Sequence, residues 1–92
     1  MIRTIRHKGM RRLFEDDERR GLPQDMVERI RVILGAIDAA DRIEDLDRPS
    51  FRLHPLRGDL KGFWSATVRA NRRIVFRFEN GEAYDVDFVD YH

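Results

Sequence analysis

The sequence contains no cysteine, which excludes disulfide bonds and thiolate metal sites. A chain without cysteine suits a reducing compartment, and we expect the protein in the cytoplasm. No apolar run approaches the roughly 20 residues that a membrane-spanning helix needs. The first ten residues, MIRTIRHKGM, also lack the apolar core of a signal peptide.

Strong compositional bias is missing as well. The 92 residues are 41% hydrophobic and 38% charged, so the chain can bury a core and still cover its surface. This balance excludes intrinsic disorder as the default. The length fits one domain, residues 1–92.

The net charge is only +1, but the charges are unevenly distributed. Residues 48–78 hold eight Arg or Lys against the single acid Asp59, whereas residues 79–92 hold five acids and no basic residue. Sixteen of the eighteen basic residues are arginine. Arginine forks bind phosphate in a bidentate manner, so the basic stretch predicts an anion-facing surface, although a GC-rich genome explains arginine richness equally well.

Two periodicities divide the chain. Apolar residues spaced three and four apart predict helices over residues 8–20 and 23–41, a helical hairpin. A period of two predicts strands over residues 51–55, 63–69, 73–78 and 83–89, with a weaker one at 2–5. The fold class is therefore α+β, with the hairpin packed on one face of a mostly antiparallel sheet.

Strand register follows from keeping apolar residues on one face. Asn80-Gly81 is typical of a two-residue hairpin, but that pairing sets Phe76 opposite Asp85 and mixes the faces. A three-residue loop over 79–81, with Gly81 left-handed, instead pairs Phe76 with Tyr84 and Ile74 with Val86. At the preceding turn, the same criterion pairs Val68 with Ile74 and Ala66 with Phe76.

These pairings predict two sheet faces of different character. The core face, covered by the helices, is expected to hold Trp64, Ala66, Val68, Ile74, Phe76, Phe78, Tyr84, Val86 and Phe88. The opposite face is expected to be polar and uncovered, with Ser65, Thr67, Arg69, Arg73, Val75, Arg77, Asp85, Asp87, Val89 and Tyr91. That arginine-rich face is a plausible ligand surface.

The residues available for chemistry are few. Of the three histidines, His7 precedes a helix and is expected at the surface, and the residues alone favour a surface role for His54 too. No histidine pair has metal-ligand spacing, and no nucleophilic serine has a convincing partner. Imidazoles, a carboxylate, a phenol and arginines remain, and these suffice to cut RNA without a metal, because the 2′-hydroxyl is the internal nucleophile.

Several stretches together resemble one known family. They are HKGMRRLFE near the start, then HPLRGD, WS-TVRANRRI, NG-AY and the closing DYH. On these motifs the chain resembles, over essentially its whole length, the HigB-type "plasmid maintenance killer" toxins of the RelE/ParE superfamily. The resemblance implies a RelE-like fold and ribosome-dependent, metal-independent cleavage of mRNA, with no cofactor. It also implies a helix-turn-helix antitoxin as partner, with operator DNA bound only through that antitoxin.

The resemblance further implies a catalytic set of His54, Asp90, Tyr91 and His92, with phosphate bound by Arg57, Arg69 and Arg73. In this interpretation, either His54 or Asp90 orients or deprotonates the 2′-hydroxyl. His92 donates a proton to the 5′-oxygen, and Tyr91 stacks on or hydrogen-bonds the substrate. Position 57 can be lysine in relatives; an arginine there cannot give up a proton at neutral pH, so only an electrostatic role fits it.

A second hypothesis is of a different class. The superfamily includes gyrase poisons that cut no RNA, so the fold alone does not decide function. In that case the protein docks on a protein or a nucleic acid through its arginine-rich face, and the histidines take no part.

Overall fold

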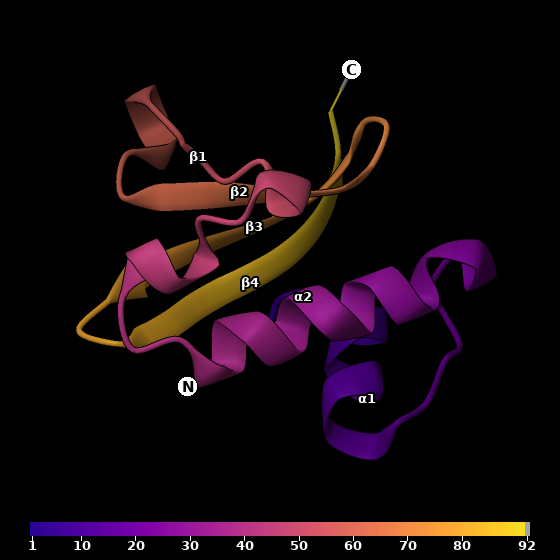
Figure 1. Cartoon of the computed structure of the whole chain (residues 1–92). Helices are drawn as coiled ribbons and strands as arrows, with labels where there is room; N and C mark the ends of the chain where they lie inside the picture. The colour runs from indigo at the N-terminus through magenta and orange to yellow at the C-terminus, as the bar shows by residue number, and fades with distance from the viewer. Residues whose placement is uncertain (92) are drawn as a thin grey trace.

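A four-stranded antiparallel sheet and a pair of helices form two layers in the computed structural model, which describes residues 1–91 (Figure 1). The strands lie in the order β1-β2-β3-β4, and both helices lie on one side of the sheet. Their bounds are α1 Lys8–Asp16, α2 Val27–Ala39, β1 His54–Pro55, β2 Phe63–Arg69, β3 Arg72–Glu79 and β4 Glu82–Asp90. The predicted α+β fold, a helical hairpin on one face of a mostly antiparallel sheet, is confirmed.

The described part of the chain also contains four short 3-10 helices: η1 Gln24–Met26, η2 Ile43–Leu46, η3 Pro49–Phe51 and η4 Gly58–Leu60. None of the helices in residues 1–91 combines the length and the apolar character needed to cross a membrane.

Helix α1 is shorter than the predicted helix over residues 8–20. It begins after His7, whose Nδ1 accepts a hydrogen bond from the Met10 N–H at 3.2 Å, so His7 is an N-cap rather than a plain surface residue. It ends because Asp17 adopts a left-handed conformation (φ 54°) and donates its N–H to the Leu13 carbonyl at 3.1 Å. The chain then turns back over the helix, where Gly21 passes so close to Gly9 that no side chain fits at position 9.

The core lies between α2 and the sheet. Helix α2 buries one side, with Val27, Ile30, Ile33, Leu34 and Ile37. From the sheet, the buried residues include Ala66, Ile74, Phe76, Ala83 and Val86, with Trp64 and Phe88 packed against them. Burial of this apolar surface holds the two layers together, at about 25 cal/mol per Å² removed from water.

The strand predicted over 51–55 is reduced to two residues. Phe51 ends η3 and is 1% exposed, anchored in the core, and Arg52 after it is left-handed (φ 47°). Only His54 and Pro55 pair with β2, opposite Ser65 and Trp64. The apolar anchor and the reversal at Arg52 therefore replace the start of the expected strand.

The pairing of β2 with β3 differs from the prediction by two residues. Ala66 lies opposite Ile74 and Trp64 opposite Phe76, with an irregularity between Thr67 and Arg69. The expected pairs, Val68 with Ile74 and Ala66 with Phe76, are therefore wrong. A shift of two preserves the side of the sheet on which a residue lies, so the predicted faces of Trp64 to Val68 and of their partners in β3 are still correct. Arg69 is the exception: it follows the irregularity and pairs with Asp25 of η1 instead of facing the uncovered side.

The β3–β4 hairpin has a two-residue turn, not the predicted three-residue loop. Glu79 lies opposite Glu82, and both turn residues have positive φ, 51° at Asn80 and 77° at Gly81, as in a type I′ turn. Tyr84 then lies opposite Arg77. The predicted Phe76–Tyr84 pair and the core placement of Tyr84 are both wrong.

A β-bulge at Asp85 corrects the polarity of the strand that follows. Asp85 is left-handed (φ 56°), and beyond it the register shifts so that Ile74 lies opposite Phe88 rather than the predicted Val86. The extra residue returns Val86 to the core, where it is 0% exposed. The two-residue turn is therefore compatible with an apolar core face.

The N-terminal residues run parallel to β4. Ile2 and Ile5 form isolated bridges to Ala83 and Val86, where the sequence predicts a weak strand. The hydroxyl of Thr4 accepts the N–H of Asp85 at 2.7 Å. The bulge thus has a hydrogen-bond partner for the backbone group that leaves the β3–β4 ladder.

Gly81→Val should lower the free energy of unfolding by about 1–2 kcal/mol, because a β-branched residue at positive φ is strained. An added Cβ would also come within 3.2 Å of the Asp41 carbonyl oxygen. Chemical denaturation measures the loss. Asn80→Gly is the matched control and should keep the midpoint, and an unchanged midpoint for Gly81→Val would contradict the turn geometry.

Candidate active site

A cavity of about 320 Å³ opens on the sheet face turned away from the helices. We call it the sheet cavity; it is lined by Arg52, His54, Leu56, Ser65, Arg73 and Tyr91. Three of these, His54, Arg73 and Tyr91, are predicted from the sequence to surround one concave region, and that placement is confirmed. Phe76 is buried on the other side of the sheet, as expected.

Arg73 has no carboxylate to neutralise it within residues 1–91. Its guanidinium donates one hydrogen bond, to the Thr67 hydroxyl at 2.8 Å. Its Nε is buried and has no hydrogen-bond partner in the described part of the chain. A buried donor on an unneutralised cation is costly unless a ligand completes it, and an anion is the ligand of matching charge.

Tyr91 is held beside Arg73 by two contacts. Its N–H donates to the Asn71 carbonyl at 2.8 Å, which ties the end of the chain to the loop between β2 and β3 (Figure 1). Its ring centre lies 5.5 Å from the Arg73 guanidinium carbon, a cation–π distance. The side chain is still 39% exposed, so the phenol can reach a ligand.

His54 and Ser65 both line the sheet cavity. They lie directly opposite each other in the β1–β2 pair. Pro55 keeps His54 extended, and the N–H of Leu56 donates to the Phe63 carbonyl at 2.9 Å, which fixes the short strand on β2. The imidazole is exposed, whereas Ser65 is 2% exposed.

Asp90, predicted to be catalytic, does not line the sheet cavity. Neighbouring residues of a strand point to opposite faces, so Asp90 and Tyr91 diverge. The Asp90 carboxylate pairs with Arg72 at 3.5 Å, and Arg72 in turn lies over the Phe88 ring. His92, the other predicted catalytic residue in this run, lies outside the described residues.

Two of the three predicted phosphate-binding arginines also lie away from the sheet cavity. Arg69 pairs with Asp25 at 2.8 Å and so ties the end of β2 to η1. Arg57 is exposed and precedes η4, one residue after Leu56. Of the three, only Arg73 lies where the cavity residues meet.

The alternation of Ser65 with Trp64 and Ala66 correctly placed Ser65 on the ligand-facing side of the sheet, whereas Arg52 and Leu56 were not predicted for the site. Arg52 carries no such signal, because its position depends on a left-handed turn (φ 47°) that arginine does not favour.

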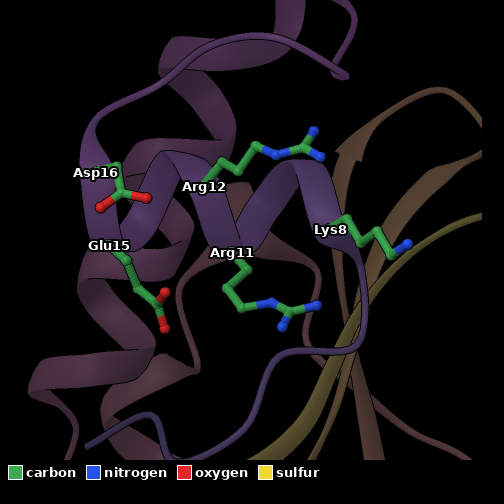
Figure 2. A pocket seen from close by; sticks show the side chains of 5 residues that line it. All are labelled: Lys8, Arg11, Arg12, Glu15 and Asp16. Atoms are coloured by element: carbon green, nitrogen blue, oxygen red, sulfur yellow. The ribbon is translucent and has the colours of Figure 1, made fainter.

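A second hollow lies along α1, lined by Lys8, Arg11, Arg12, Glu15 and Asp16 (Figure 2). We call its three cations, Lys8, Arg11 and Arg12, the α1 cluster. None of them forms an ion pair within residues 1–91. The cations lie toward the N-terminal end of the helix and the acids at its C-terminal end, which opposes the helix dipole.

Residues 1–91 contain no group of three His, Asp or Glu side chains placed to hold a metal ion. The sheet cavity presents an imidazole, a phenol, a hydroxyl and guanidinium groups. This set can transfer protons and neutralise an anionic substrate.

The Arg73 guanidinium should be the one that responds most to inorganic phosphate. In a titration followed by NMR of the arginine Nε–H groups, the Arg73 signal should shift most, because its Nε has no hydrogen-bond partner within residues 1–91. Arg69, already paired with Asp25, is the internal control. Equal shifts at Arg69 and Arg73, or the same shifts with chloride at equal ionic strength, would contradict an anion site.

The chain is similar to known proteins in both sequence and fold. A family model described as "RelE-like toxin of type II toxin-antitoxin system HigB" matches residues 3–92. The chain is 50% identical to "Endoribonuclease HigB" of Proteus vulgaris over 92 residues, which cover 100% of both chains. It is 31% identical to "Toxin HigB-1" of Vibrio cholerae over 94 residues, covering 100% of this chain and 98% of the relative.

Solved structures show the same fold at lower identity. A YoeB–YefM toxin–antitoxin complex from Staphylococcus aureus matches with a TM-score of 0.63 and 18% identity, covering 100% of this chain and 95% of the other. The YoeB dimer of the same organism matches with a TM-score of 0.61 and 18% identity, covering 99% and 94%. At this identity the likeness speaks for the fold alone.

Proposed function

The chain belongs to the HigB family of RelE-like toxins from type II toxin–antitoxin systems, and from this membership we propose that it is an endoribonuclease that cuts mRNA on the ribosome without a metal. The observation that carries the proposal is the sheet cavity, where His54 and Tyr91 meet the unneutralised guanidinium of Arg73. The Proteus vulgaris relative, named an endoribonuclease, supports the same reaction class.

The proposed reaction needs no external nucleophile. The 2′-oxygen attacks the adjacent phosphorus, the P–O2′ bond forms and the P–O5′ bond breaks. The proton of the 2′-hydroxyl passes to a base on the enzyme, and an acid returns a proton to the departing 5′-oxygen. The products are a 2′,3′-cyclic phosphate and a 5′-hydroxyl.

His54 is the better candidate for the group that orients or deprotonates the 2′-hydroxyl. It lines the sheet cavity, whereas the Asp90 carboxylate pairs with Arg72 outside it. An imidazole can accept a proton from a hydroxyl and is a common general base in enzymes. In this proposal Asp90 acts indirectly, by favouring the protonated form of its neighbour in sequence, His92, which serves as the acid.

Arg73 neutralises the scissile phosphate in this proposal. Its Nε faces no protein acceptor within residues 1–91, and Thr67 and Tyr91 orient the rest of the group. Tyr91 stacks on, or hydrogen-bonds to, the nucleotide beside it. Arg57 contributes charge at the margin, whereas Arg69 already has its carboxylate partner and is not carried forward.

His54→Ala should reduce cleavage by about 10²–10⁴-fold, the usual range for a lost proton-transfer group. Deleting His92 should reduce it similarly. His54→Ala should not alter the thermal midpoint much, because His54 is exposed. The assay uses mRNA on programmed ribosomes, with analysis of the product ends.

His7→Asn is the matched control, because asparagine can also cap α1. It should leave cleavage unchanged. If the His54 and His92 variants remain as toxic as the intact protein, the catalytic proposal fails, and docking on a protein such as gyrase or on a nucleic acid takes its place.

The α1 cluster supports contact with ribosomal RNA. Three cations without carboxylate partners are kept at the end of a helix where the dipole disfavours positive charge. A contact with phosphates would compensate for that cost. We assign this surface to the ribosome and the sheet cavity to the mRNA.

Lys8→Glu should therefore change stability and function in opposite directions. A carboxylate in the first turn of α1 should raise the free energy of unfolding by about 0.3–1 kcal/mol, while ribosome binding, measured by co-sedimentation, should weaken. Arg42→Glu makes the same kind of charge change before η2 and should leave co-sedimentation nearly unchanged. Equal loss in both variants would reject a specific α1 contact.

An antitoxin is the expected protein partner. The matching family is defined by type II toxin–antitoxin systems, and the YoeB of Staphylococcus aureus is seen in complex with YefM. We propose a helix-turn-helix antitoxin, and contact with operator DNA only through it. A toxin that acts on mRNA at the ribosome works in the cytoplasm.

A further inference from the structure

Arg52 adopts a conformation that its own side chain does not explain. Its backbone is left-handed, φ 47° and ψ 50°, a region that disfavours residues with a Cβ other than Asn and Asp. The reversal lets Phe51 enter the core, at 1% exposure, while Arg52 joins the lining of the sheet cavity. An unfavourable backbone conformation at a cavity residue points to a function for its side chain.

Arg29 of α2 fixes the segment that carries Arg52. Its half-buried guanidinium donates to the Ser50 carbonyl, and its central carbon lies 5.3 Å from the Phe51 ring centre. Ser50 and Phe51 directly precede Arg52, so their position sets where the Arg52 side chain begins. Side chains locked by packing and hydrogen bonds hold a site more accurately than free loops do.

The same guanidinium also reaches the strand that orients Arg73. Arg29 donates to the Thr67 carbonyl at 3.1 Å and to the Val68 carbonyl at 3.4 Å. The hydroxyl of Thr67 accepts the hydrogen bond from Arg73. One side chain of the helical layer therefore positions both cavity arginines relative to each other.

Arg52 and Arg73 enter the sheet cavity from opposite sides of β2. Arg52 precedes β1, and Arg73 belongs to β3, so β2 lies between their backbones. Neighbouring strands are about 4.8 Å apart, so β1 and β3 are roughly 10 Å apart across β2. Neither arginine has a carboxylate partner within residues 1–91.

We propose that Arg52 binds a second RNA phosphate, next to the scissile one held by Arg73, and that Arg29 is the residue that positions Arg52. The proposal rests on the proposed endoribonuclease function. Two separated cations fit two consecutive phosphates of one strand, with the intervening nucleoside over Ser65 and Leu56. Arg52 is then a binding residue, and Arg29 touches no substrate.

Arg52→Gly separates this role from stability. Glycine adopts positive φ without strain, so the thermal midpoint should stay the same or rise. Binding of an RNA with a 2′-deoxy nucleotide at the cleavage position, which cannot be cut, should weaken roughly 10-fold or more on programmed ribosomes. The slope of log affinity against log salt should fall by about 0.7, the value for one lost single-strand phosphate contact.

A set of RNAs with one uncharged methylphosphonate linkage each identifies the phosphate. For the intact protein, the linkage beside the scissile one should weaken binding when it is neutralised. For Arg52→Gly, that linkage should no longer matter. Arg29→Lys should also make binding insensitive to that linkage, although Arg52 is still present. The double variant Arg29→Lys/Arg52→Gly should show no further loss of sensitivity to the linkage. Arg42→Ala, which removes an exposed arginine near η2, should keep the full profile.

The outcomes are distinguishable. If the intact protein binds with this linkage preference but cuts no RNA, the endoribonuclease proposal fails and the phosphate subsite stands. If Arg52→Gly retains the salt slope and the linkage profile of the intact protein, the subsite is rejected. If Arg52→Gly loses the linkage dependence but Arg29→Lys, while folded, keeps it, the positioning role of Arg29 is rejected.

Discussion

The bulge at Asp85 decides which side of the sheet every later residue of β4 faces. Without it, strict alternation from Tyr84 would turn Phe88 to solvent and Asp85 and Asp87 into the core. With it, Val86 and Phe88 return to the helices, and Tyr91 reaches the sheet cavity. The same inversion directs Asp90 away from that cavity, toward Arg72. One extra residue thus sets both the core and the edge of the candidate active site.

The N-terminal segment supports this bulge from outside. Thr4 takes the N–H of Asp85, and Arg6 pairs with the Asp85 carboxylate at 3.5 Å. Thr4 and Arg6 therefore stabilise a bulge that lies far from them in the sequence. Because such contacts close the largest loop in the chain, we expect them late in folding.

The sequence pattern correctly predicted which face of the sheet most side chains of β2 and β3 occupy, because this depends only on whether residues are an even or an odd number of positions apart. The error of two residues in the β2–β3 register left Ser65 and Arg73 on the correct face, because side chains alternate with a period of two. Parity failed at Tyr84, where the bulge intervenes. A trace of the bulge was present in the sequence, since the apolar residues Ala83, Val86 and Phe88, which all pack in or against the core, are spaced by three and then two.

The sequence motifs, by contrast, suggested candidate site residues but did not indicate where their side chains lie in the fold. His54, Arg73 and Tyr91 meet as predicted, whereas Asp90, Arg57 and Arg69 do not line the same cavity. No local pattern distinguishes Arg69, which is paired with Asp25, from Arg73, which is not. That difference comes from η1 packing beside β2, which is a tertiary contact.

Charge pairing separates structural arginines from those available to a ligand. Within residues 1–91, eight arginines pair with carboxylates: Arg3, Arg6, Arg19, Arg20, Arg31, Arg69, Arg72 and Arg77. The pairs are at least partly exposed and contribute little stability each. Their effect is to cancel charge around the periphery. A positive field therefore remains at the sheet cavity and the α1 cluster although the net charge is only +1.

Unfavourable backbone conformations also occur next to the sheet cavity. Among residues 1–91, five residues other than glycine have positive φ: Asp17, Arg52, Ala70, Asn80 and Asp85. Asn and Asp tolerate this conformation, because their short polar side chains can hydrogen-bond locally. Arg52 and Ala70 have no such compensation, and both serve the sheet cavity.

Ala70 makes the turn that presents the Asn71 carbonyl to the N–H of Tyr91, and Arg52 lines the cavity directly. The two least favourable backbone conformations in residues 1–91 thus flank one site. Strain of this kind persists only where the surrounding structure enforces it. Here Phe51, anchored in the core, and Arg29, bound to the carbonyls of Ser50 and Thr67, enforce it on the Arg52 side. The helical layer therefore holds the cavity in its geometry as well as covering the core face of the sheet.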